Sequence, residues 1–303
     1  MLKTIAFSIL TISTINVYAQ GCADAGFCSV GAMQHGLLKE KGDRNTAGFS
    51  VAVASGEKRA WVISPQLEIK AIVNNNSYID IKLPYQIVTG NLGGNFGIGD
   101  LISTYTHRIK TKNEKLKMNY TAGLRVGLGN ADDQLNGKSL PMAYQTSLGT
   151  TDVILGISAN VGKYFVLAAG IQQPVLQYND NGYHTIQNRD SIETVYFSSR
   201  HLRRAGDALL RIEAKKDWKH TGIHGGPLLL YHLTDDKSIL ADGTQITLQN
   251  SAGFTININL GFYYRTDKWV FDFTVAGPVY ARDNRPDGLT RNAIVIPRIT
   301  FNL

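Results

Sequence analysis

Gly253–Tyr264 reads GFTININLGFYY, a stretch in which apolar and polar residues alternate. Its even positions hold phenylalanine, isoleucine, leucine and tyrosine, whereas threonine, asparagine and glycine hold most of the odd ones. Successive side chains of a β-strand point to opposite faces of the sheet, so this stretch predicts a strand with one apolar and one polar face. Lys117–Leu128 and Ala205–Lys215 repeat the pattern.

Alternation of this kind recurs along the chain from residue 45 onward and predicts about twelve strands, an even number. The expected strands cover 46–56, 60–73, 78–90, 98–111, 116–129, 144–160, 163–178, 203–216, 219–233, 250–265, 267–281 and 291–303. We therefore expect an all-β fold.

The connections between these strands alternate in length. Short ones such as 74–77 and 161–162 are interleaved with mostly longer ones, notably 130–143, 179–202 and 234–249. A soluble β-sandwich has no reason to alternate in this way, whereas barrels of the bacterial outer membrane join short periplasmic turns to longer external loops. The pattern predicts a transmembrane antiparallel β-barrel over 45–303 in the cell outer membrane, with both termini periplasmic.

The two ends of the chain fit export to that membrane. Residues 1–19 combine Lys3, a short apolar run and a small residue at Ala19, which predicts a cleaved signal peptide. Residues 297–303 read PRITFNL, with apolar residues at every second position up to the last, which resembles the terminal strand signal of barrels. The expected partners are outer-membrane lipids, the barrel-assembly machinery and a small-molecule ligand whose identity is unknown.

Residues 20–44 lack strand periodicity and contain both cysteines, Cys22 and Cys28. In an exported protein a disulfide between them is favoured, because such bridges persist outside the cytoplasm. Metal binding is the rival interpretation of two nearby thiols. We expect the segment either to form a small disulfide-knotted plug in the lumen or to remain a periplasmic tail.

When the apolar strand faces are turned toward lipid, the charged strand residues face the lumen. The inward set is Glu68, Lys70, Asp80, Lys82, Asp100, Arg125, Asp152, Asp207, Arg211, Glu213, Asp272 and Arg298. Both signs are mixed, so the lumen is either an aqueous passage or an interior closed by paired charges. A narrow bore and the tendency of buried charges to pair favour the closed lumen.

Gly97 and Gly99 precede Asp100 in an expected strand, where glycine permits a bend or the close approach of another backbone. This predicts either a gap or ligand contact in the wall, or a weakened strand end packed against the N-terminal segment. The candidate substrate path comprises Gly97, Gly99, Asp100, Arg125, Asp152, Arg211, Glu213 and Arg298.

Several stretches resemble a known group of proteins. They are 21–31 (GCADAGFCSVG), 83–86 (LPYQ), 97–101 (GIGDL), 140–152 (LPMAYQTSLGTTD) and 286–291 (PDGLTR). Together they resemble Bacteroidota outer-membrane proteins that are similar to the transporter-like barrels named after the meta-pathway of phenol degradation, which are loosely related to long-chain fatty-acid transporters. The resemblance implies passage of small, often hydrophobic compounds across the outer membrane.

Other functions are less well supported by the residues. The net charge of +7 is scattered and forms no basic patch with stacking aromatics, so we expect no nucleic-acid binding. Acidic pairs at 132–133 and 235–236, together with His184 and His201, supply the residue types of a loop protease, but such pairs are common in solvated loops. We expect no enzymatic activity, no cofactor and no metal site.

The function expected from the sequence is a channel or transporter-like barrel for passage or binding of a small compound, hydrophobic according to the resemblance. The alternative is a non-conducting structural or interaction barrel within an outer-membrane assembly.

Overall fold

The computed structural model describes residues 44–56, 59–109, 116–185, 196–288 and 291–303. The signal peptide predicted over 1–19 and the Cys22–Cys28 disulfide lie outside the described residues, as does all but the last residue of the plug or tail predicted over 20–44.

Thirteen strands build the wall of the molecule. They are β1 (Thr46–Gly56), β2 (Trp61–Asn74), β3 (Ser77–Gly90), β4 (Gly93–Ile98), β5 (Leu101–Ile109), β6 (Leu116–Val126), β9 (Thr150–Val161), β10 (Phe165–Gln177), β11 (Asp207–Asp217), β12 (Thr221–His232), β15 (Gly253–Arg265), β16 (Trp269–Tyr280) and β17 (Arg291–Asn302). Two small hairpins, β7 (Gln134–Leu135) with β8 (Lys138–Ser139) and β13 (Lys237–Ile239) with β14 (Gln245–Thr247), and the 3₁₀-helix η4 (Met142–Tyr144) lie in the long connections.

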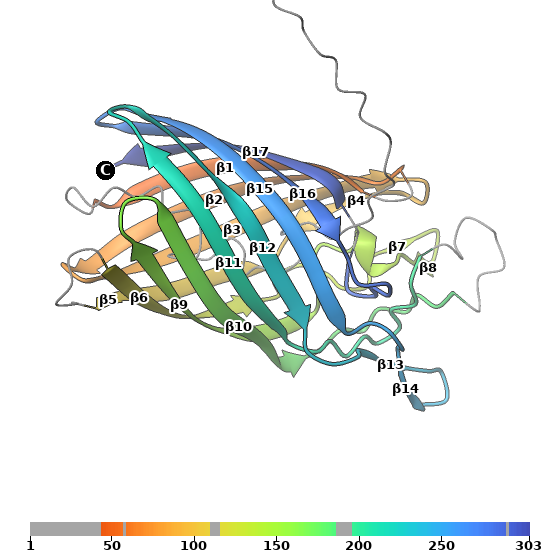
Figure 1. The fold of residues 1–303 in the computed structure, drawn as a ribbon. Coiled ribbons are helices and arrows are strands. Elements are labelled where there is room, and N and C mark those ends of the chain that lie inside the picture. The colour runs from red at the N-terminus through yellow and green to blue at the C-terminus, as the bar shows by residue number, and fades with distance from the viewer. Residues whose placement is uncertain (1–43, 57–58, 110–115, 186–195, 289–290) are drawn as a thin grey trace, which may run out of the picture.

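The wall strands form one closed antiparallel barrel (Figure 1). Their order is β2-β1-β17-β16-β15-β12-β11-β10-β9-β6-β5-β3-β4, and the pairing of β2 with β3 closes the ring. β4 and β5 follow one another along the same flank of β3, so the thirteen strands fill twelve positions around the barrel. The prediction of about twelve antiparallel strands is confirmed.

The connections divide the barrel into two ends. Short turns such as 75–76, 162–164 and 266–268 lie at the end we call the turn end, together with the last residue of β17. The described parts of the long connections 127–149, 178–206, 233–252 and 281–290 lie at the opposite end, the loop end, on the right in Figure 1. The predicted alternation of connection length is therefore present in the structure.

Two predicted strands differ from the observed ones. The strand predicted over 98–111 begins as β5 at Leu101, after a break at Gly99 and Asp100, and β4 lies almost wholly in 91–97, the stretch predicted as a connection. The strand predicted over 144–160 begins only at Thr150, because the chain from Met142 to Leu148 is mostly buried beside the mouth and turns into the wall at Gly149, whose φ is +64°.

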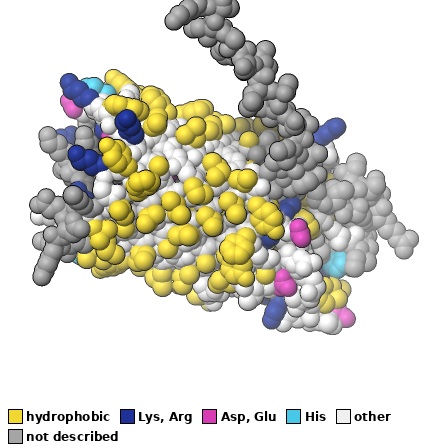
Figure 2. All heavy atoms as spheres, in the orientation of Figure 1, with side chains coloured by type: hydrophobic (Ala, Val, Ile, Leu, Met, Phe, Trp, Pro, Cys, Tyr) yellow, Lys and Arg dark blue, Asp and Glu magenta, His cyan; other side chains and the backbone are white. Residues whose placement is uncertain are grey.

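The outer face of the wall is covered by apolar side chains (Figure 2). Its middle carries exposed aliphatic residues, among them Leu67, Leu124, Leu155, Ile157, Ile212 and Leu260. Exposed aromatic residues lie nearer the two ends, such as Trp61, Phe254 and Tyr280 at the loop end and Tyr164, Trp218 and Trp269 at the turn end. An apolar band between aromatic girdles is the surface of a barrel that lies in a lipid bilayer.

The inner face is polar and tightly filled. Thr106, Asp152, Gln172 and Glu213 all point inward and are fully buried. Their strands therefore enclose a packed interior, and the charged residues within it are desolvated. Among the described residues there is no helix long and apolar enough to cross a membrane.

Candidate functional site

The wall is interrupted where β4 gives way to β5. β3 pairs with β5 over Ser77–Lys82 and with β4 over Tyr85–Gly90, so Leu83 and Pro84 face the interruption. Proline has no backbone N–H to offer a neighbouring strand. The Gly99 N–H instead donates to the Pro84 carbonyl at 2.8 Å, and a Cβ on Gly99 would lie only 2.9 Å from the Pro84 ring. Glycine is required here by close packing against proline.

β4 has a free edge on its other side. β5 pairs with β6 up to the match of Leu101 with Val126, but β4 stands last in the sheet order and has no second strand partner in the described part of the chain. The residues that follow β6 run past this edge, because a Cβ on Gly129 would lie 2.2 Å from the Ile98 carbonyl oxygen. Yet the Gly127 N–H donates to the Thr150 carbonyl at 3.0 Å, which keeps this segment with β9.

The connection 127–149 covers the break from inside. A Cβ on Gly97 would meet the Thr146 methyl group at 3.2 Å. The Asn95 amide donates to the Asp133 carboxylate at 2.7 Å and to the Tyr144 carbonyl at 2.8 Å. The loop is thus attached to β4 through side chains and not through a ladder of backbone hydrogen bonds. We call the free edge of β4, together with residues 127–129 and Thr146, the wall break.

The outer rim of the wall break is apolar. Phe96 and Ile98 point outward from β4 and are 71% and 48% exposed. Leu128, on the other side of the break, is 53% exposed, and Leu124 lies below it on β6. A molecule at this rim would contact hydrocarbon side chains and the edge of one strand.

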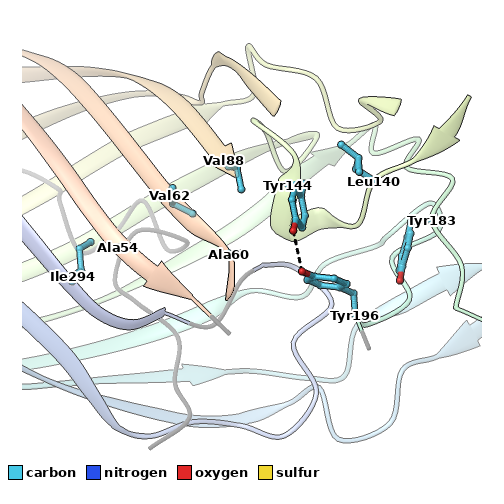
Figure 3. Packing of buried hydrophobic residues seen from close by; sticks show 9 residues of the cluster. All are labelled: Ala54, Ala60, Val62, Val88, Leu140, Tyr144, Tyr183, Tyr196 and Ile294. Carbon is cyan, nitrogen blue, oxygen red and sulfur yellow. Dashed lines mark hydrogen bonds between the residues drawn. The ribbon is translucent and has the colours of Figure 1, made fainter. Parts of the chain in front are cut away.

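Next to the wall break, part of the inside of the loop end is apolar as well (Figure 3). Wall residues Val62 and Val88 pack in one cluster with Tyr144 from η4 and Tyr196 from the connection 178–206. The hydroxyl groups of Tyr144 and Tyr196 form a hydrogen bond of 3.0 Å, drawn as the dashed line in Figure 3. Burial, together with this hydrogen bond, raises the pKa of Tyr196, so the cluster carries no charge. We call it the mouth cluster.

Five of the eight residues predicted for the substrate path meet at the wall break. Gly97 and Gly99 flank Ile98 at the end of β4, and Asp100 follows them. The Asp100 carboxylate forms a buried ion pair of 2.5 Å with Arg125, which stands opposite Asp152 in the register of β6 and β9. The Asp152 carboxylate accepts a hydrogen bond of 2.5 Å from Gln172.

The other three predicted path residues lie elsewhere, in a belt of charge across the interior. Arg298 binds Glu68 at 3.1 Å, and Lys82 lies 3.7 Å from the same carboxylate. On the opposite wall, Glu213 lies 3.6 Å from His224, and Arg211 is on the same face of β11. Both signs are present and the side chains are buried or nearly so, as expected for an interior closed by paired charges. We call this set the charge belt.

The sequence did not reveal a third group, at the loop end. Arg204 donates from Nε to Asp287 at 2.8 Å and also binds Asp207, while Arg282 binds the second Asp287 oxygen at 2.5 Å. His232 lies 2.7 Å from Asp207 and joins the same group. These residues come from three stretches that lie far apart in the sequence, around 204–207, 232–236 and 282–287, so no spacing within one stretch could show that all of them meet. We call this set, with Asp236, the loop-end cluster.

The ionic state of Asp287 gives a first prediction. Burial alone would raise its pKa, but Arg282 and Arg204 together lower the pKa well below its ordinary value. Because the folded pKa is the lower one, the stabilisation is complete above the unfolded value of about 3.9 and is lost only as the pH falls toward the folded value. Asp287→Asn is expected to lower the free energy of unfolding by about 1.5–3 kcal/mol near neutral pH.

Urea titrations of the parent and of Asp287→Asn in lipid vesicles, at several pH values, measure this difference. As long as His232 keeps its proton, the difference should be constant above about pH 5, and it should shrink below about pH 4. A difference that already shrinks between neutral pH and about pH 5 would show that Asp287 is not held by its two arginines.

Residue types that a hydrolase uses also meet in the structure. Ser77 Oγ and His107 Nδ1 lie 2.8 Å apart, on neighbouring strands near the turn end. Ser77 is only 2% exposed and also accepts a hydrogen bond from the Tyr105 hydroxyl at 2.8 Å. The acidic pairs at 132–133 and 235–236 bind loop groups, for example Asp132 to the Gly182 N–H and Asp235 to the Ala252 N–H, both at 2.8 Å.

Comparison with known proteins supports the fold. No protein-family model matches the sequence, and no curated protein matches it either. The structure is similar to an outer membrane channel from Pseudomonas putida F1, with a TM-score of 0.63 and 14% identity over 89% of this chain and 99% of that one. It also matches, more weakly, the KdgM porin (TM-score 0.45, 10% identity, 85% of this chain and 99% of that one).

A Pseudomonas aeruginosa FadL homologue is a further weak match, with a TM-score of 0.38 and 10% identity over 86% of this chain and 90% of that one. At such low identity, the likeness to the Pseudomonas putida channel shows that the two chains share a fold.

Proposed function

We propose that this protein is an outer-membrane barrel that passes a small hydrophobic compound through the wall break beside β4. The observation that carries the proposal is the free edge of β4, which is apolar on its outer rim and lies next to the apolar mouth cluster on the inside. The shared fold with an outer membrane channel and the resemblance to the phenol-pathway group of Bacteroidota barrels support this function. The loops would then face outward and both termini the periplasm.

A free strand edge is costly in a membrane. Hydrocarbon offers no hydrogen bonds to unpaired backbone groups, so open sheet edges are tolerated only where protein covers them or where they line a cavity. In this barrel the connection 127–149 covers the edge of β4 through side-chain contacts, notably that of Gly97 with Thr146. Because no backbone ladder has to break, this connection can move away from β4 at modest cost.

The charge belt argues against an axial route for an apolar compound. Glu68, Lys82, Arg298, Glu213 and His224 lie across the interior on the turn-end side of the mouth cluster. Burying such groups against an apolar ligand costs several kcal/mol when it separates them from their partners. A compound that leaves the mouth cluster through the wall break avoids this belt.

The charge belt also favours a second candidate function, a non-conducting structural or interaction barrel. An interior filled by ion pairs is what a barrel without cargo needs. Transport measurements with a closed wall break distinguish the two functions.

An engineered disulfide tests the wall break. An ideal Cβ on Gly97 lies 3.6 Å from the Thr146 Cβ, within the range of about 3.5–4.5 Å that disulfides adopt. We would introduce Gly97→Cys and Thr146→Cys into a Cys22→Ser/Cys28→Ser parent. Uptake of the lipophilic dye N-phenyl-1-naphthylamine is then measured in intact cells, where the outer leaflet excludes it.

Cells with the parent protein are expected to take up the dye faster than cells without it. Oxidation of the double-cysteine variant should abolish this gain, and a reductant should restore it. The single variants Gly97→Cys and Thr146→Cys are matched controls, because they carry the added bulk but cannot form the bridge. Undiminished uptake with the bridge confirmed by mass spectrometry contradicts the wall route, and a parent without any gain favours the structural barrel.

A further inference from the structure

The loop-end cluster joins three long connections in one buried group. Its members are Arg204, Asp207, His232, Asp236, Arg282 and Asp287, each no more than 5% exposed. Arg204 belongs to the connection 178–206, Asp236 to 233–252, and Arg282 and Asp287 to 281–290. Asp207 begins β11 and His232 ends β12, so the cluster attaches these connections to the wall.

His232 lies at the centre of this group. Its Nδ1 is 2.7 Å from an Asp207 oxygen, and its Nε2 is 2.8 Å from an Asp236 oxygen. Asp236 also accepts the Ala205 N–H at 2.8 Å, which ties the start of β11 to the connection after β12. The ring therefore bridges two carboxylates that belong to different segments.

Both ring nitrogens of His232 face an acceptor. A neutral imidazole has one N–H and one bare nitrogen, so it can donate to only one of the two carboxylates, whereas the protonated ring donates to both. The contacts on both sides of the ring thus fit the charged form. If the proton leaves, a nitrogen lone pair faces a carboxylate oxygen at hydrogen-bond distance.

The charges of the cluster balance only with that proton in place. Arg204, Arg282 and protonated His232 supply three positive charges, and Asp207, Asp236 and Asp287 supply three negative ones. A neutral ring leaves one negative charge in excess in a buried site. An uncompensated charge of this kind is strongly unfavourable away from water.

Charged groups surround His232 from every element packed against the cluster. Burial alone would lower the pKa of Arg204, but Asp207 and Asp287 raise that pKa above its ordinary value. Arg282 also faces the ring, Asp152 interacts with Arg204, and Arg285 donates to the Arg282 carbonyl. Asp235 lies next to Ser251, which accepts the Asp236 N–H. Of these groups, only histidine ordinarily changes charge near neutral pH.

We propose that His232 is a pH-sensitive latch, whose protonated ring holds the three connections together over the loop end and whose deprotonation releases them. The latch acts through the geometry of the cluster and does not depend on what the barrel transports. The test of the latch therefore measures the position of the connections and not transport. The latch can be confirmed when the transport proposal fails, and it can fail when the transport proposal is confirmed.

Spin labels on two of the connections report their separation. Ala241 and Asp283 are exposed, lie in different connections and take no part in the cluster. We would place cysteines at both positions in the Cys22→Ser/Cys28→Ser background, reconstitute the protein in lipid nanodiscs and record electron–electron distances at about pH 5.5 and about pH 9.5. Ring NMR signals of His232 show in parallel whether it has lost its proton.

In acid, the spin labels in the parent are expected to show one narrow distribution of distances. This narrow component should be lost once His232 is neutral. The His232→Gln variant should lack the narrow component at both pH values, because an amide cannot supply the positive charge of the protonated ring. The Asp236→Asn variant should keep the narrow component at both pH values, because the charges of two arginines and two aspartates then balance around a neutral ring. A narrow distance in the parent that survives deprotonation of His232, or that persists in His232→Gln, overturns the latch, as does a ring that does not titrate in this range.

Discussion

Replacing Leu155 by arginine is expected to lower the free energy of unfolding in a lipid bilayer by about 2–4 kcal/mol. Leu155 lies in the middle of β9 and points outward between Ala122 and Ile171 on the neighbouring strands. If the apolar band is embedded in hydrocarbon, the guanidinium must be drawn into it or must distort the bilayer around it. Reversible urea unfolding in phospholipid vesicles measures the loss.

Leu176→Arg is the matched control for this substitution. Leu176 is also exposed, at 61%, but it lies one residue from the end of β10 at the loop end. A charge close to the interface reaches water easily, so we expect a loss of only about 0–1 kcal/mol. Equal losses at the two positions, or none at Leu155, would contradict the placement of the apolar band in the bilayer.

Arg125→Met is expected to have the largest effect on stability, about 3–5 kcal/mol. The substitution removes the partner of Asp100, whose carboxylate is 4% exposed and lies 2.5 Å from the guanidinium. An unpaired carboxylate would then be buried beside the interruption between β4 and β5. The same unfolding measurement in vesicles determines the loss.

The double variant Asp100→Leu/Arg125→Met separates charge from packing. When both charges are removed, no buried charge is left without a partner, so most of the loss should be recovered. Arg125→Lys keeps the positive charge and should cost less than Arg125→Met. If the double variant is as unstable as the single one, the role of the pair is packing and not neutralisation of charge.

The barrel was predictable because its signal is local. A strand that separates lipid from a polar interior must alternate at every residue, as Gly253–Tyr264 does, and the length of each connection can be counted directly. Gly97 and Gly99 indicated a bend or gap in the wall, but the end of the strand at Gly99 was not predicted, because it depends on Pro84, a residue of the neighbouring strand. The buried turn of chain around Tyr144 directly precedes β9 and was mistaken for the start of that strand.

The candidate site was predictable in part for the same reason. Asp100 and Arg125 were placed inward by alternation, and the glycines beside Asp100 indicated a special place in the wall. Their meeting in one ion pair follows from the register of β5 and β6, which alternation does not fix. The loop-end cluster was missed because Arg204 and Asp287 are brought together only by the closed barrel.

Single-channel recording in planar bilayers separates passage through the wall from an axial pore. Because the charge belt closes the interior, we expect a quiet baseline without steady ion openings. The protein recorded is the one whose dye uptake in cells is sensitive to the Gly97–Thr146 bridge. Steady openings that persist with the bridge oxidised would show that ions pass along the barrel axis, and would contradict the closed interior on which the route through the break beside β4 depends.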